Sequence, residues 1–263
     1  MSAVVEIAAV GNELLEGVTQ DTNTHWLCRS VTALGSTVRR AVIVRDDRAA
    51  IAAEVQGAQA RHTDLLLVTG GLGPTADDLT LEGVAQAAGA PLAEHPQARA
   101  MVARRYEELH RSGAVSAPDL TPERLKMACL PQGAEPIENP VGAAPAVLLA
   151  LEGTCVVCLP GVPRELQAIF AGPLQPVLAR FLGAGLTLER EVMVRLGDES
   201  AMAAALSAVA ALHPGIYIKS HARDFQRGQG IRVTLSARGT DRATLEHALD
   251  AAISSLRQRL PLA

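Results

Sequence analysis

Short apolar runs alternate with segments of helical periodicity over the first 182 residues, and this alternation limits the fold more than any other feature. Strands are predicted at residues 3–11, 37–47 and 64–71, and helices at residues 21–35, 48–61, 78–89, 95–113, 122–130 and 164–182. Because the strands are mostly apolar and do not alternate regularly with polar residues, both of their faces need a cover of helices. The pattern therefore predicts a mostly parallel α/β sheet with helices on both sides.

The pattern changes near the end of this region. Two apolar stretches around the turn at residues 152–154 predict a hairpin. Further along, residues 187–259 follow the order strand, helix, strand, strand, helix. We therefore predict two domains, residues 1–183 and residues 186–263, of which the second is a small α+β unit.

Composition excludes several classes of protein. No apolar run approaches the roughly 20 residues that cross a bilayer. The first ten residues have no basic segment before their apolar stretch, unlike a signal peptide. We therefore expect a cytoplasmic protein with no membrane partner. A formal charge of -4 and 2% aromatic residues offer little to phosphate backbones or bases, so nucleic acid is not expected as a partner.

The four cysteines, Cys28, Cys129, Cys155 and Cys158, are too few and too scattered for a disulfide framework. Cys155 and Cys158 form a C-x-x-C motif, but their segment TCVVCLPG is typical of a buried strand that leads into a turn. No second pair or nearby histidine completes a tetrahedral metal site. We expect structural thiols rather than a redox or zinc pair.

Four unusual loops follow predicted strands: GNELLEG, RDD, TGGLGPTADD and LPGVP. In a doubly wound sheet, ligands bind beyond the carboxyl ends of the strands. We therefore expect these four loops to form one site.

The loop TGGLGPTADD carries the strongest chemical signal. Gly70, Gly71 and Gly73 allow the backbone to approach a ligand closely, and their amides suit phosphate oxygens. Asp77 and Asp78 would repel a phosphate unless a divalent cation such as Mg²⁺ stands between them. The loop therefore predicts a phosphate site with a metal on the two aspartates. The alternative is that both aspartates only cap the next helix.

Other loop residues are weaker candidates. Glu13 is either a ligand or metal contact or a solvated acid. Three polar residues are placed near the same rim by topology: Asp21, Asn23 and Asp46. Asn139, Gly142 and Ala143 fit a tight turn against a ligand, and an ordinary turn into a strand explains them nearly as well.

Five motifs resemble, in order and spacing, those of the molybdopterin-binding fold family, most closely its competence/damage-inducible protein A (CinA) type: VGNELLEG, QDTNTHWL, VTGGLGPTADDLT, NPVGAAPA and LPGVPREL. The resemblance spans about residues 4–182, and the tail is similar to the small KH-like domain of these proteins. It implies a three-layer α/β/α domain, a homodimer and a site for a nucleotide-like or pterin-like phosphate ligand. Many members also carry a C-terminal domain that deamidates nicotinamide mononucleotide, and that activity is not expected of the sequence to Ala263.

By position in these motifs, the resemblance assigns phosphate and metal binding to the glycines and aspartates of the loop TGGLGPTADD. Lys126 takes the place where the family often has a lysine near its ligand. Met127 and Ala146 depart from the family pattern, which usually has glutamine and glycine at these places. The candidate ligand contacts are Gly11, Asn12, Asp46, Thr69, Gly70, Gly71, Gly73, Pro74, Thr75, Lys126, Asn139, Gly142, Ala143, Pro160 and Gly161.

Domains of the CinA type are associated with metal-dependent ADP-ribose pyrophosphatase activity, which gives the first functional prediction. In this hydrolase Asp77 and Asp78 would hold Mg²⁺, Mn²⁺ or Co²⁺, and Asp78 or Glu13 would act as the catalytic base that orients water. The alternative is a molybdopterin-binding or adenylylating protein, as among more distant relatives.

A further alternative is a non-enzymatic interaction protein whose KH-like tail contacts RNA or a protein partner. Four basic residues of the tail support it: Lys219, Arg223, Arg227 and Arg232. The GXXG clamp of KH domains is missing, because Gly228 and Gly230 lie only two residues apart.

Overall fold

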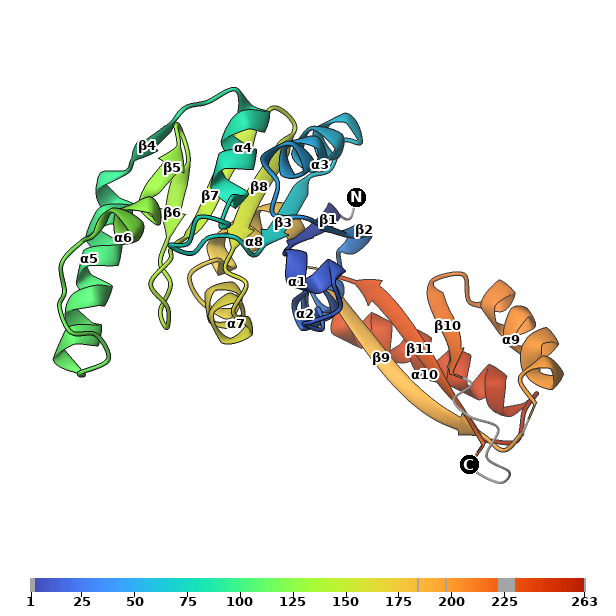
Figure 1. The fold of residues 1–263 in the computed structure, drawn as a ribbon. Helices are drawn as coiled ribbons and strands as arrows, with labels where there is room; N and C mark the ends of the chain where they lie inside the picture. The colour runs from blue at the N-terminus through green and yellow to red at the C-terminus, as the bar shows by residue number, and fades with distance from the viewer. Residues whose placement is uncertain (1–2, 184, 197, 222–229, 263) are drawn as a thin grey trace. The chain divides into compact units, whose positions relative to one another are not determined.

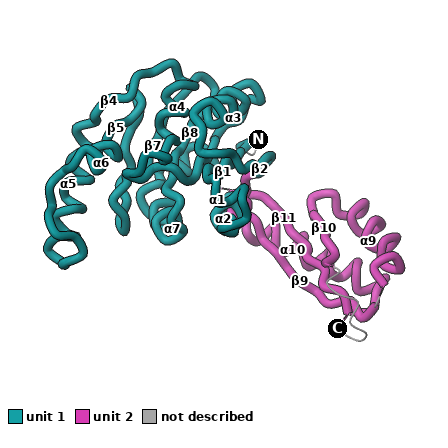
Figure 2. Tube along the Cα trace, in the orientation of Figure 1, with its two compact units in different colours: residues 1–31, 37–183 teal, residues 32–36, 184–263 magenta. Residues whose placement is uncertain are grey.

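The computed structural model describes residues 3–183, 185–196, 198–221 and 230–262 (Figure 1). The chain divides into two compact units (Figure 2). The first unit comprises Met1–Val31 and Thr37–Gly183, and the second comprises Thr32–Ser36 and Ala184–Ala263. Each unit has its own sheet and its own hydrophobic core.

The first unit is built on a six-stranded sheet in the order β2-β1-β3-β8-β7-β6. Its strands are β1 (Val4–Val10), β2 (Thr37–Val44), β3 (Leu65–Thr69), β6 (Glu135–Ile137), β7 (Ala146–Leu151) and β8 (Thr154–Leu159). The pairs β2-β1, β1-β3 and β3-β8 are parallel, whereas β7 pairs antiparallel with both β8 and β6. The predicted mostly parallel sheet is confirmed, and so is the hairpin of β7 and β8.

Helices cover both faces of this sheet (Figure 1). On one face lie α3 (Arg48–Ala60) and α4 (Thr80–Ala88), whose Ile51, Val55 and Val84 are buried in one cluster with side chains of β1, β3 and β8. On the other face lie α2 (Thr22–Ala33) and α7 (Pro163–Ala171), which meet where Trp26 and Phe170 pack edge to face at 5.2 Å. These three layers confirm the predicted fold class.

The remaining elements of the first unit include α1 (Asn12–Leu15), α5 (Pro96–Arg111), α6 (Pro122–Lys126) and a two-stranded sheet of β4 (Leu92–Glu94) and β5 (Cys129–Pro131). Two predicted helices are wrong in extent. Residues 164–182 form α7 and α8 (Gln175–Leu182), because Gly172 leaves helical dihedral angles and Pro173 lacks an amide hydrogen. The helix predicted at residues 122–130 ends at Lys126, because the chain then pairs with β4.

The second unit has the predicted order of elements: β9 (Leu186–Val194), α9 (Ser200–Leu212), β10 (Ile216–His221), β11 (Ile231–Gly239) and α10 (Arg242–Arg257). Its antiparallel sheet has the order β10-β11-β9. One face of α10 is buried against that sheet, with Leu249, Ala252 and Leu256 fully inaccessible to solvent. The small α+β unit is therefore confirmed.

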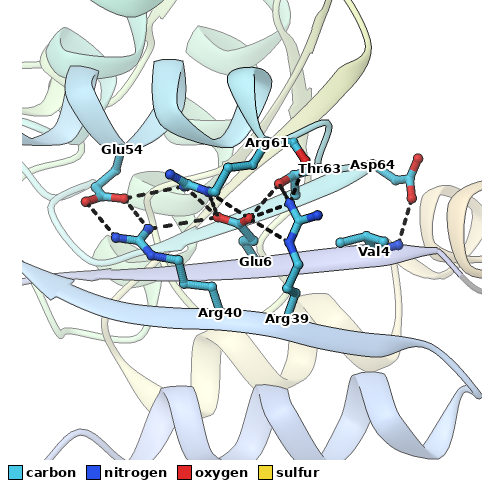
Figure 3. Close-up of polar contacts among 8 residues, drawn as sticks. All are labelled: Val4, Glu6, Arg39, Arg40, Glu54, Arg61, Thr63 and Asp64. Carbon is cyan, nitrogen blue, oxygen red and sulfur yellow. Dashed lines mark hydrogen bonds and ion pairs between the residues drawn. The ribbon is translucent and has the colours of Figure 1, made fainter.

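Glu6 is a buried carboxylate within the apolar strand β1, only 1% exposed. Arg39, Arg61 and Thr63 surround it and donate hydrogen bonds of 2.7–3.3 Å to its oxygens (Figure 3). Burial by itself would raise the pKa of Glu6, but the hydrogen bonds from Arg61, Arg39 and Thr63 outweigh it and lower that pKa to about 2. The two arginines therefore compensate the buried charge of Glu6, so this residue can stand in a strand of the sheet.

The C-x-x-C pair lies on β8, and its two side chains point to opposite faces of the sheet because they are three residues apart on one strand. Cys158 packs in the cluster below α3 and α4, and Cys155 lies outside that cluster. Burial raises the pKa of Cys155 to about 11 and that of Cys158 to about 12. Two inert thiols on opposite faces cannot form a disulfide with each other or share a metal ion.

Among the described residues, every helix is too short or too polar to cross a lipid bilayer.

Candidate functional site

A cavity of about 470 Å³ lies at the carboxyl ends of β1, β3 and β8 in the first unit. Its wall contains residues from all four loops that the sequence predicts to converge, from Gly11 after β1 to Gly161 after β8. The volume falls within the usual range for a small-molecule site. Of the predicted contacts, thirteen line it: Gly11, Glu13, Asp46, Thr69, Gly70, Gly71, Gly73, Pro74, Asp77, Asp78, Ala143, Pro160 and Gly161.

Gly70 and Gly71 both have positive φ angles, which favour glycine, and a Cβ at Gly70 would also stand too close to a neighbouring carbonyl. Gly70 has a φ of 101°, and a Cβ there would stand 2.2 Å from the carbonyl oxygen of Val10. Gly71 has a φ of 63°, and its carbonyl accepts a hydrogen bond of 3.2 Å from the amide of Thr80. The Thr80 hydroxyl donates to the Gly70 carbonyl at 2.7 Å, so this buried threonine fixes the loop from below. The sequence prediction missed Thr80.

The amides of the loop divide into used and available donors. Gly70 donates its amide to the Leu159 carbonyl at 3.0 Å, which extends the β3-β8 pairing and removes this amide from ligand binding. The amides of Gly71, Leu72 and Gly73 make no hydrogen bond within the part of the chain that the structure describes. The donors available to a ligand are therefore residues 71–73, rather than the predicted set that included Gly70.

The two aspartates of the loop have different roles. Neither caps α4, whose preceding residue, Leu79, makes no side-chain capping bond. Asp78 instead accepts hydrogen bonds from the amide and hydroxyl of Thr75, at 2.8 and 2.5 Å, and closes the loop on itself. Asp77 is exposed, and hydrogen bonding from Thr75 and from the backbone, with a smaller effect of the charge of Lys126, holds its pKa below the usual range. Asp77 is thus the more available ligand for a cation.

Lys126 lies beneath the loop rather than in the cavity wall. Its Nζ donates to the Thr75 carbonyl, and it lines a small separate hollow with Gly71, Gly73 and Asp78. Asn12 likewise supports the loop after β2, since its backbone amide donates to the carboxylate of Asp46 at 2.7 Å. Lys126, Thr75 and Asn12 therefore hold cavity residues in place.

The turn at residues 139–144 is also a support. Asn139 is 9% exposed and makes all of its side-chain hydrogen bonds within the protein. Asn139 and Gly142 line a second hollow of about 80 Å³, and from this turn Ala143 and Ala144 reach the main cavity. Arg105 of α5 holds the turn from outside through a bond of 2.6 Å to the Val141 carbonyl.

The rim candidates Asp21 and Asn23 line the cavity as expected, and the lining also includes Tyr106 and Glu165, which the sequence did not single out. Asn23, at the start of α2, donates to the Gly161 carbonyl at 2.7 Å and so joins α2 to the loop after β8. Tyr106 of α5 lies under the guanidinium of Arg124, which is 3.9 Å from its ring centre. Glu165 stands in the first turn of α7. In sequence, Tyr106 and Glu165 fit ordinary helix patterns, and only their position in the fold brings them to the site.

The charge of the cavity wall is one-sided. Six carboxylates line it: Glu13, Asp21, Asp46, Asp77, Asp78 and Glu165. Among the described lining residues, none is lysine, arginine or histidine. A phosphorylated ligand would be repelled here unless a cation accompanied it. No three acidic, histidine or cysteine side chains of the described residues are grouped closely enough to hold a metal by themselves, so ligand oxygens would have to complete its coordination.

The basic residues suggested for the second unit are only partly described. Lys219 is exposed on β10, and Arg232 forms an ion pair of 3.2 Å with Glu191. Arg223, Arg227 and Gly228 lie outside the described residues. The structure therefore adds nothing in favour of an RNA-binding tail.

The chain is similar to several known proteins. Residues 6–180 match the family model described as a probable molybdopterin binding domain. A protein of Aeropyrum pernix is 42% identical over 96% of this chain and 90% of its own, and one of Pyrobaculum aerophilum is 42% identical over 86% and 82%. The crystal structure of the protein CinA, of unknown function, from Thermoplasma acidophilum is 38% identical, covers 66% of this chain and 98% of its own, and superposes with a TM-score of 0.60.

Proposed function

Because the chain belongs to the family of the probable molybdopterin binding domain, and within it to the CinA type, we propose that its cavity binds a phosphorylated pterin-like ligand together with a divalent metal ion. One observation carries the proposal. Residues 71–73, whose amides are available, and Asp77 line the same cavity, and its described lining has no basic side chain.

These groups suit a metal-phosphate complex better than a free phosphate. Amides of Gly71, Leu72 and Gly73 would donate to phosphate oxygens, as glycine-rich loops do. Asp77 would hold the metal ion, with Asp78 next to it and phosphate oxygens as the remaining ligands. The metal would neutralise charge between the phosphate and the six carboxylates. Mg²⁺, Mn²⁺ and Co²⁺ all have the required preference for oxygen ligands or tolerate it.

Hydrolysis of a pyrophosphate bond, as in ADP-ribose, is the second candidate, and Glu13 favours it. This exposed carboxylate lines the cavity and makes no side-chain hydrogen bond with another described residue. A bound metal supplies charge neutralisation at phosphorus and lowers the pKa of a coordinated water. Glu13 would take a proton from the attacking water as the bond between the two phosphates breaks, giving AMP and ribose 5-phosphate. Asp78 is less suited as the base because Thr75 already occupies one of its oxygens.

Calorimetric titration with neopterin monophosphate and with ADP-ribose, each with and without Mg²⁺ or Mn²⁺, tests both candidates. We expect binding only with metal, and on the order of tenfold weaker binding by Asp77→Asn. Asp250→Asn, which removes an exposed carboxylate from α10, is the matched control and should bind like the wild type.

Turnover separates the two candidates. Metal-dependent binding of the pterin without release of AMP from ADP-ribose supports a binding or adenylylating protein, and incubation with ATP then tests adenylylation. Steady AMP release that is lost in Glu13→Gln supports the hydrolase. Equal metal-dependent binding by the wild type and Asp77→Asn would contradict both. The homodimer implied by the resemblance stays a prediction, which sedimentation equilibrium would test.

A further inference from the structure

Glu165 lies in the first turn of α7 and lines the cavity. It follows β8 by six residues and lines the cavity rather than facing solvent on the outside of α7. Its Oε2 accepts a hydrogen bond of 2.7 Å from Nδ2 of Asn139, which belongs to the turn before β7. The carboxylate is therefore attached to two separate parts of the cavity wall.

The space for this carboxylate depends on a glycine. A Cβ on Gly142 would stand 2.0 Å from Oε2 and 2.2 Å from Cδ of Glu165, so no other residue fits there without moving the acid. Asn139 is itself fixed, because its Oδ1 accepts from the amides of Val141 and Gly142 and its Nδ2 also donates to the Ala144 carbonyl. Glu165 is therefore held by Asn139, whose side-chain amide makes all of its hydrogen bonds within the protein.

The hydrogen bond from Asn139 uses one oxygen of Glu165 and leaves the other available to a ligand. Its Oε1 has no hydrogen bond to any described residue, and no described lysine, arginine or histidine lines the cavity to pair with it. An ionised carboxylate accepts hydrogen bonds but donates none. A ligand group that hydrogen-bonds to Oε1 must therefore present an N–H or O–H donor, and a fully ionised phosphate has none.

We propose that Glu165 recognises the ring of the ligand by accepting hydrogen bonds from a ring N–H and the adjacent amino group of a 2-amino-4-oxopyrimidine edge. Pterins and guanine share this edge. Adenine does not, because its amino group is next to a ring nitrogen that is itself an acceptor and would oppose the carboxylate. The inference rests on the proposed function, in which residues 71–73 and Asp77 hold the phosphate end, and it narrows the ring to one chemical class.

The test compares purine monophosphates that differ only at this edge. GMP, IMP and AMP are titrated in the presence of Mg²⁺ into the wild type and into Glu165→Gln, with Glu107→Gln on the exposed side of α5 as the control. The wild type should bind GMP more tightly than AMP by a factor on the order of 10 to 100, with IMP between them because it lacks the amino group. Glu165→Gln should lose most of this preference, and Glu107→Gln should keep it.

Two further measurements check that the variant folds and whether the ligand is a pterin or a guanine nucleotide. The glutamine carbonyl of Glu165→Gln can still accept from Asn139, so its melting temperature should match that of the control. Titration with neopterin monophosphate then compares the two sources of the edge: tighter binding than GMP identifies a pterin, and weaker binding identifies a guanine nucleotide.

The failures are distinguishable. Equal affinity of the wild type for GMP and AMP, with binding of both lost in Asp77→Asn, would overturn the role of Glu165 and leave the phosphate site standing. A GMP preference that persists in Glu165→Gln would overturn it as well. Absence of metal-dependent binding by all of these ligands would overturn both proposals.

Discussion

Arg61 holds the buried carboxylate of Glu6 through two nitrogens, with Nη2 2.7 Å from Oε2 and Nε 3.0 Å from Oε1 (Figure 3). Arg61 directly follows α3, and Glu6 lies in the middle of β1. The pair therefore ties a covering helix to the sheet whose strands lead into all four of the cavity loops.

Glu6→Gln should lower the free energy of unfolding of the first unit by about 3 kcal/mol, because it leaves Arg39 and Arg61 without their shared charge. Urea unfolding followed by Trp26, the single tryptophan, measures this change within the first unit. Glu138→Gln breaks an exposed ion pair with Arg104 and should cost less than about 1 kcal/mol. Equal losses in the two variants would contradict the role of Glu6.

Acid should destabilise the wild type more than Glu6→Gln. The folded pKa of Glu6 is about 2, below its ordinary value of 4.5, so its contribution is fully present above pH 4.5 and is lost as the pH falls towards 2. The difference in stability between the two proteins should therefore shrink by up to about 3 kcal/mol over this range. Unfolding curves at pH 6, 4 and 3 measure it, and a constant difference would refute the assignment.

Gly70→Ala should destabilise the first unit by about 3 kcal/mol and abolish metal-dependent ligand binding, because the new Cβ meets the rigid Val10 carbonyl. Gly89→Ala is the matched control. Gly89 also has a positive φ, of 61°, but a Cβ there contacts nothing within 4 Å. It should therefore cost only about 1 kcal/mol and leave binding intact. Thermal unfolding and calorimetry distinguish the two variants.

Cys155 and Cys158 should not react with iodoacetamide at pH 8 in the folded protein, because burial raises both of their pKa values far above that pH. Peptide mass spectrometry after labelling, with and without urea, locates the modified thiols. Cys28 and Cys129 are partly exposed and serve as internal references. A disulfide between Cys155 and Cys158 in the native protein would disprove their placement on opposite faces of β8.

Local sequence determined much of this protein. Mostly apolar runs with helices between them specified a parallel sheet covered on both faces, and the position of GGLGPTADD after β3 specified where a ligand site should lie. These features follow from periodicity and turn chemistry, which depend on neighbouring residues alone. The same reasoning placed Glu6 in an apolar strand without indicating that arginines would surround it.

Tertiary structure decided how each polar group is used. The Gly70 amide donates to the carbonyl of Leu159, 89 residues away in the chain, Asp78 accepts from Thr75 while Asp77 stays exposed, and Asn139 supports the cavity through Glu165. Periodicity cannot reveal these partners, because hydrogen bonds depend on which groups the sheet order brings together. That order, with β8 beside β3, joins segments that are far apart in the chain.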